Sequence, residues 1–193
     1  MTRLFLVRHG PTHAKTMIGW TDLPADLSDL LALARLNAYL PQAPVVSSDL
    51  WRATATADCL SSARPRLPHE PGFREIHFGA WEQRSFAQAE ADQPSLIRAF
   101  WDSPGQITAP DGESWDDVTK RVWAALDRHL ESTDPGPKDL IIVAHFGAIL
   151  ACLQRALGVS AVQVFSHKID NLSVTELTCD STGWTVGRIN HIP

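Results

Sequence analysis

Two apolar runs that each end in a histidine constrain this chain most strongly. Residues 4–7 lead into Arg8 and His9, and residues 140–144 lead into His145. Continuous apolar runs of this kind are typical of strands that are buried on both faces of a parallel sheet. Functional sites of such sheets form beyond the carboxyl ends of the strands. We therefore expect His9 and His145 to lie together although they are far apart in the chain.

The rest of the pattern predicts an α/β fold. We expect a single domain over residues 1–193 that forms a three-layer sandwich. Its mostly parallel central sheet would have helices on both faces and one antiparallel strand near the C-terminus. A small helical cap is expected as an insertion at about residues 83–110. Apolar spacing and breakers predict helices at 27–40, 50–62, 83–91, 94–101, 115–130 (ending before 134–137) and 148–157, and a terminal hairpin from 173–178 and 184–189.

Composition narrows the classes of function. The chain has 17 Lys and Arg residues against 22 Asp and Glu residues, a formal net charge of -5. This balance argues against a nucleic-acid partner, because a phosphate backbone attracts a strongly basic face. No apolar run is long enough to span a bilayer, so no membrane partner is expected. The widely spaced Cys59, Cys152 and Cys179 indicate buried free thiols, and a cytoplasmic location is expected.

An anion site is predicted next to a short strand at residues 45–46. Ser47, Ser48 and Asp49 are good N-cap residues for the helix expected over 50–62. This start places Arg52 in the first turn of the helix. Free amide donors and the helix dipole favour an anion there, and the guanidinium group adds a charged, forked donor.

Taken together, these motifs resemble the histidine phosphatase superfamily, which includes the cofactor-dependent phosphoglycerate mutases. The matches follow the order of that family over most of the chain. Departures stand at Pro11, Lys15, Gln83 and Phe146, and none of them removes a catalytic group. The matching residues are Arg8-His9-Gly10, Ser47-Ser48-Asp49-Leu50 with Arg52-Ala53, Arg74-Glu75-Ile76 with Phe78-Gly79 and Trp81-Glu82, Gly112-Glu113-Ser114, and Val143-Ala144-His145.

The resemblance implies roles for individual residues. His9 would be the nucleophile that forms a covalent phosphohistidine, and Glu75 would donate a proton to the leaving oxygen. Arg8, Arg52 and His145 would surround the phosphoryl oxygens, so that no metal ion or other cofactor is needed. The candidate catalytic residues are Arg8, His9, Arg52, Glu75 and His145, and the candidate substrate-binding residues are Arg8, Arg52, Thr12 and Phe146.

Several assignments stay open from the sequence. Glu82 is an alternative carboxylate to Glu75 in the same stretch, and His77 could line the pocket or pack beside Phe78. His13 follows His9 by four residues, as metal ligands on a helix do, but no carboxylate lies near it in the sequence. Whether substrate is contacted is undecided for Lys15, His77, Arg84 and Arg98.

Hydrolysis of a small phosphorylated metabolite is the expected reaction. In the mutase branch an arginine follows the acid, whereas Ile76 follows Glu75 here. The predicted cap is short, and Arg84 and Arg98 are its only arginines, too few to clamp a bisphosphate. A phosphoglycerate mutase-type transfer and a catalytically silent module that binds a phosphorylated ligand are the alternatives. The substrate and the oligomeric state are not predicted.

Overall fold

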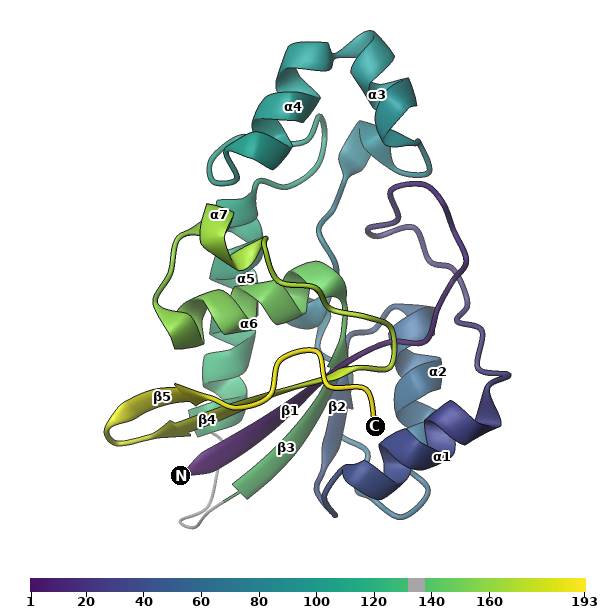
Figure 1. Cartoon of the computed structure of the whole chain (residues 1–193), viewed down its shortest axis with the longest axis vertical. Coiled ribbons are helices and arrows are strands. Elements are labelled where there is room, and N and C mark those ends of the chain that lie inside the picture. Colours follow the sequence, from purple (N-terminus) through teal and green to yellow (C-terminus); the bar gives the residue numbers. More distant parts are fainter. Residues whose placement is uncertain (132–137) are drawn as a thin grey trace.

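The protein, seen in a computed structural model, is described over residues 1–131 and 138–193 (Figure 1). In these segments five strands form one sheet in the order β2-β3-β1-β4-β5. β1 and β2 each pair with β3 in parallel, whereas β4 pairs antiparallel with β1 and β5. The α/β prediction is confirmed, with two antiparallel strands rather than one. The strands are β1 (Thr2–Arg8), β2 (Val45–Ser47), β3 (Lys138–Ala144), β4 (Val174–Asp180) and β5 (Gly183–Val186).

Helices cover both faces of the sheet, as predicted. In Figure 1, α5 and α6 lie on one side of the sheet, α1 and α2 lie on the other, and α3 and α4 lie beyond it at the top. The short α7 and the 3₁₀ turns at Pro71–Phe73 and Gly79–Trp81 were not predicted. The helices are α1 (Leu30–Tyr39), α2 (Trp51–Leu60), α3 (Phe86–Asp92), α4 (Pro94–Asp102), α5 (Trp115–Glu131), α6 (Phe146–Leu157) and α7 (Ala161–Val164).

Three other predictions concern the end of α5, membrane-spanning helices and the cysteines. The predicted end of the helix before residues 134–137 lies outside the described residues. None of the helices in the described segments has the length and apolar character that crossing a bilayer requires. All three cysteines are free, but only Cys152 is buried. Cys59 is exposed because it points away from the core near the end of α2.

The alternation of side chains along β1 builds two separate cores. Leu4 and Leu6 join the cluster that includes residues of α5 and α6, whereas Phe5 and Val7 join the cluster that includes residues of α1 and α2. Successive residues of a strand point to opposite faces, so a wholly apolar strand must be covered on both sides. Burial of the whole run fixes β1 in the centre of the molecule.

The register of β1 against β3 sets the place of the site. Arg8 pairs with Ala144 at the last position of both strands, and the amide of His9 donates to the Ala144 carbonyl at 3.0 Å. His9 and His145 therefore leave the sheet side by side. After His145 the chain turns directly into α6, which ends at Leu157 as predicted and is followed by Gly158 in a left-handed conformation (φ 64°).

The N-cap prediction for α2 is wrong in its detail. Leu50 occupies the N-cap position and makes no side-chain capping bond. The carboxylate of Asp22, from a distant loop, accepts a hydrogen bond of 2.6 Å from the amide of Trp51 instead. A tertiary contact thus takes the place of the local cap, and Arg52 still falls in the first turn of the helix.

Candidate active site

His9 and His145 meet at one edge of the sheet. His9 follows β1, His145 follows β3, and their ring centroids lie 5.0 Å apart. Both side chains are buried, His145 completely. The convergence that the two apolar runs predicted is therefore present in the structure, and it follows from the parallel pairing of the strands.

Hydrogen bonds define the state of the His9 ring. Its Nδ1 atom lies 2.6 Å from the carbonyl oxygen of Gly10, and because a carbonyl oxygen only accepts, Nδ1 carries the proton. Arg52 Nε donates to the other ring nitrogen, Nε2, at 3.3 Å. Burial, followed by the charge of Arg52, lowers the pKa of His9 to about 3. Near neutral pH the ring is thus neutral, and the Nε2 lone pair faces the arginine.

Two arginines, Arg52 buried and Arg8 partly buried, provide positive charge around this nitrogen. Arg52 donates to the carbonyl oxygens of Gly19 at 2.6 Å and Thr21 at 3.0 Å. Arg8 donates to the carbonyl oxygen of Ile169 at 2.6 Å. Burial lowers the pKa of both arginines, but a guanidinium group stays charged in proteins. The carbonyl contacts hold both groups in place without neutralising them.

Three buried nitrogens near the histidines have no hydrogen-bond partner among the described residues. They are Nε of Arg8 and both ring nitrogens of His145. Burial, then the neighbouring His9 and Arg52, lowers the pKa of His145 well below its usual value, so this ring is also neutral. Buried polar groups are normally paired. Because a neutral imidazole has one donor and one acceptor, the donors in this set are Arg8 Nε and one N–H of His145, and the acceptor oxygens of a phosphoryl group suit such donors.

Glu75 brings a buried carboxyl group to the same site. Its Oε1 accepts hydrogen bonds from the amide of Ile76 at 2.9 Å and from the amide of Gly147, in the first turn of α6, at 2.8 Å. Burial raises the pKa of Glu75, although these bonds and the charges of Arg52 and Arg8 oppose the rise. The environment therefore favours the protonated form, which a proton donor requires.

A cavity of about 230 Å³ connects these groups. Six of the predicted site residues line it, and five apolar side chains, Phe146 among them, form its apolar wall. His145 is not a lining residue and reaches the site through its contact with the His9 ring. The lining residues are Arg8, His9, Thr12, Ala14, Thr16, Met17, Ile18, Arg52, Glu75, Phe78, Trp101 and Phe146.

The residues that the sequence left undecided lie outside this lining. The ring of His77 packs against Trp20, with centroids 4.6 Å apart. The two cap arginines of this set form ion pairs with Asp92 at 2.5 Å and Glu90 at 2.6 Å. The residues absent from the cavity lining are Lys15, His77, Arg84 and Arg98.

Glu82, the alternative carboxylate, has a different environment from Glu75. Burial tends to raise its pKa, but the hydrogen bonds that it accepts outweigh burial and lower the pKa overall. Because Gly19 and Thr21 are also the acceptors for Arg52, Glu82 holds the loop that holds the arginine. The donors to its carboxylate are the amides of Gly19, Trp20, Thr21 and Phe78 and the hydroxyl group of Thr21, at 2.6 to 3.1 Å.

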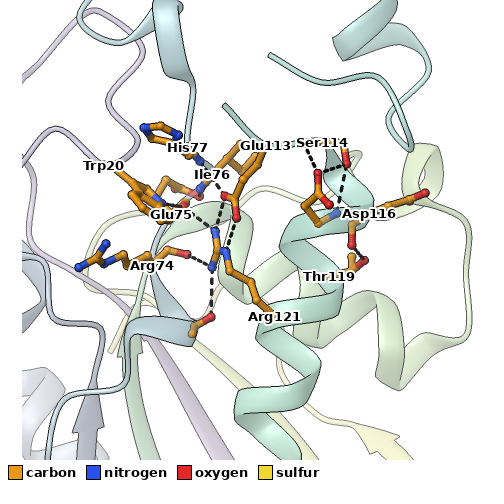
Figure 2. Close-up of polar contacts among 12 residues, drawn as sticks. Trp20, Arg74, Glu75, Ile76, His77, Glu113, Ser114, Asp116, Thr119 and Arg121 are labelled. Atoms are coloured by element: carbon orange, nitrogen blue, oxygen red, sulfur yellow. Dashed lines mark hydrogen bonds and ion pairs between the residues drawn. The ribbon is translucent and has the colours of Figure 1, made fainter. Parts of the chain in front are cut away.

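A pair of residues behind Glu75 was missed as part of the site. Figure 2 shows Arg121 reaching from α5 toward the segment that carries Glu75, with Glu113 beside it. In the sequence, Glu113 stands out only as part of the motif Gly112-Glu113-Ser114. One sequence feature could have pointed to Arg121. It follows the buried Val118 by three residues and so lies at the border of the apolar face of α5.

In residues 1–131 and 138–193 no group of three or more histidine, cysteine, aspartate or glutamate side chains is placed to hold a metal ion. His13 instead forms an exposed ion pair with Asp26 at 2.8 Å.

Comparisons with known proteins agree with this geometry. The model of the histidine phosphatase superfamily (branch 1) matches residues 4–192. The bifunctional protein Rv2228c of Mycobacterium tuberculosis is 32% identical over 93% of this chain, which covers 51% of that protein, about half its length. The probable phosphoglycerate mutase GpmB of Proteus mirabilis is 26% identical over 100% of this chain and 95% of its own length.

The fold of this chain is also similar to that of a solved structure. The mycobacterial glucosyl-3-phosphoglycerate phosphatase Rv2419c aligns with a TM-score of 0.81 and 28% identity, over 99% of both chains. Its complex with inorganic phosphate aligns with a TM-score of 0.82 and 27% identity, over 97% of this chain and 96% of the other. Fold and sequence thus point to the same group of proteins.

Proposed function

The chain belongs to the histidine phosphatase superfamily, and on this premise we propose that it is a metal-independent phosphomonoesterase that acts through a phosphohistidine at His9. One observation carries the proposal: the neutral His9 ring holds its proton on Nδ1 and turns Nε2 toward Arg52 inside the cavity. A nitrogen lone pair beside a fixed cation is suited to attack a phosphoryl group.

In the first step, His9 Nε2 forms a bond to phosphorus while the bond from phosphorus to the leaving oxygen breaks. Glu75 gives its proton to that oxygen, and an alcohol leaves. Arg8 and Arg52 stabilise the negative charge on the phosphoryl oxygens. The raised pKa of Glu75 supports this role, because an acid must hold its proton at working pH.

In the second step, water replaces the alcohol. The carboxylate of Glu75 takes a proton from water as the water oxygen attacks phosphorus, and the bond from phosphorus to Nε2 breaks. Inorganic phosphate leaves, and both His9 and Glu75 return to their starting states. Dividing the transfer into two steps lowers each barrier relative to direct attack by water.

The lining of the cavity favours hydrolysis over mutase-type transfer. Arg8 and Arg52 are the cations that line it, and both are placed around His9. A phosphoglycerate carries an additional carboxylate, which calls for a further cation. The apolar wall of the cavity instead suits a leaving group with little charge. This wall consists of Met17, Ile18, Phe78, Trp101 and Phe146.

A chromogenic aryl phosphate tests the proposal. With excess EDTA, wild-type protein should release phosphate, and His9→Ala should lose the activity by at least about 10³-fold, since it lacks the nucleophile. Activity that requires added metal, or that persists in His9→Ala, would overturn the mechanism.

Two further measurements separate the alternatives. A mutase would convert 3-phosphoglycerate to 2-phosphoglycerate with little free phosphate. A silent binding module would bind phosphomonoesters without turnover. A screen of phosphorylated metabolites, read as liberated phosphate, would then identify the physiological substrate, for which we expect an uncharged or weakly charged leaving group.

A further inference from the structure

We propose that Glu113 and Arg121 are positioning residues that set the reactivity of Glu75 without touching the substrate. The inference rests on the proposed role of Glu75 as proton donor. Neither residue lines the cavity. They act through the backbone of the segment that carries Glu75.

The guanidinium group of Arg121 donates hydrogen bonds to three backbone carbonyl oxygens in the segment that contains Glu75. Its Nη2 donates to the carbonyl oxygen of Glu75 at 2.7 Å, and its Nη1 donates to those of Arg74 at 2.8 Å and Gly72 at 3.1 Å (Figure 2). Trp20 Nε1 adds a second donor to the Glu75 carbonyl at 2.8 Å. The peptide plane that follows Glu75 is thus held by side chains from two distant parts of the chain.

Glu113 fixes the other side of the same segment. It accepts two hydrogen bonds from Arg121, from Nε at 2.6 Å and from Nη2 at 2.8 Å. Its Oε2 also accepts from the amide of His77 at 2.9 Å, and its own amide donates to the His77 carbonyl at 2.9 Å. The pair is largely buried, with side-chain exposures of 16% for Glu113 and 19% for Arg121. A fork-to-carboxylate pair of this kind is geometrically demanding.

These contacts reach the carboxyl group through Ile76. The Glu75 carboxyl oxygen accepts from the Ile76 amide at 2.9 Å and from the Gly147 amide at 2.8 Å. Because the Ile76 amide belongs to the peptide plane that Arg121 holds, a shift of this plane moves one of the two donors and the side chain together. A displacement of about 1 Å is enough to impair a positioned catalytic group.

The dependence of rate on leaving group tests the positioning role. An alkyl phosphate has a poor leaving group and needs the proton from Glu75, whereas 2,4-dinitrophenyl phosphate does not. We expect Arg121→Ala and Glu113→Gln to lower kcat/KM, which reports the first chemical step, on the alkyl phosphate at least about tenfold more than on the dinitrophenyl ester. Glu75→Gln should show the same selective loss, and Arg121→Lys, which keeps the charge and part of the contacts, should recover part of it.

Arg155→Ala is the matched control. Arg155 forms an ion pair with Asp127 at 2.8 Å between α6 and α5, but it does not contact the Glu75 segment. It should lower thermal stability without a selective effect on kcat/KM. If Arg121→Ala and Arg121→Lys lose activity equally on both esters while Glu75→Gln is selective, the positioning role is wrong. If Glu75→Gln itself is not selective, the proposed proton donor is wrong, and this inference fails with it.

Discussion

Glu75 and Glu82 are two carboxylates of one short segment that the fold places in opposite environments. Glu75 is buried beside the cavity, and two amides donate to its carboxyl oxygen. Glu82 is half-buried away from the cavity and accepts five hydrogen bonds. The pKa of Glu75 is raised by burial, whereas that of Glu82 is lowered because its hydrogen bonds outweigh burial.

The difference shows how the number of hydrogen-bond donors decides whether the pKa of a buried carboxyl group rises or falls in this fold. With few donors, burial dominates and the pKa rises. With many donors, the ionised form is stabilised, and the charge organises a loop. Glu82 thereby supports the Gly19 and Thr21 carbonyls that orient Arg52. Glu75 takes part in the proposed proton transfer, whereas Glu82 supports the loop that positions Arg52.

The largest expected effect comes from Glu75→Gln. The amide cannot give a proton to the leaving oxygen, so kcat/KM on an alkyl phosphate should fall about 10²- to 10⁴-fold. The folded protein should remain at least as stable at pH 7, because a neutral amide replaces a buried acid. Steady-state kinetics and thermal unfolding check both parts. Retention of full activity on the alkyl ester would remove Glu75 from the mechanism.

Glu82→Gln should give a smaller loss of activity, without selectivity between the two esters. The loop that holds Arg52 loses its charged acceptor, so we expect a loss of about 10- to 10²-fold on alkyl and dinitrophenyl phosphates alike. Removing charge-assisted hydrogen bonds from a half-buried site should also cost about 2 kcal/mol of unfolding free energy. Denaturant titration measures this cost. A selective loss on the alkyl ester would make Glu82 the acid.

Gly147→Ala should disturb the Glu75 carboxyl group directly. A Cβ at this position would overlap the Glu75 carboxyl oxygen and the side chain of Ile76. We expect a loss of about tenfold on the alkyl phosphate and a smaller loss on the dinitrophenyl ester. Gly105→Ala, where a Cβ meets nothing closer than 4.0 Å, is the matched control. Equal losses on the two esters would show that the overlap acts through something other than the acid.

The pH dependence of stability should separate the two carboxyl groups with opposite signs. The raised pKa of Glu75 contributes stability that is present below its unfolded value near 4.5 and is lost as pH rises through the folded pKa. The lowered pKa of Glu82 contributes stability that is present above 4.5 and is lost as pH falls through the folded pKa.

As pH falls from 7 to below 4, Glu75→Gln should therefore lose stability relative to wild type and Glu82→Gln should gain. The change should be at most about 1.4 kcal/mol per pH unit for each group. Denaturant unfolding at several pH values measures it. Parallel curves for the two variants would contradict the assigned charge states.

The sequence predicted what depends on local pattern. The apolar runs before His9 and His145 located both strands and hence the site, because buried parallel strands leave few other arrangements. The sequence could not separate Glu75 from Glu82, since the deciding donors come from residues 19–21 and Gly147. The prediction of the α2 N-cap failed for the same reason. The amide of Trp51 donates to Asp22, which only the fold brings close to it.

Direct detection of the covalent intermediate tests the central claim. Because Glu75 also activates water in the second step, Glu75→Gln mixed with 2,4-dinitrophenyl phosphate should accumulate phosphoprotein. Alkaline quench, which preserves a phosphorus–nitrogen bond, followed by peptide mass spectrometry, locates the group. We predict one phosphoryl group on His9 in Glu75→Gln, a smaller amount in Glu82→Gln and none in His9→Ala. Turnover without phosphorylation of His9, or phosphorylation at His145 instead, would contradict the mechanism.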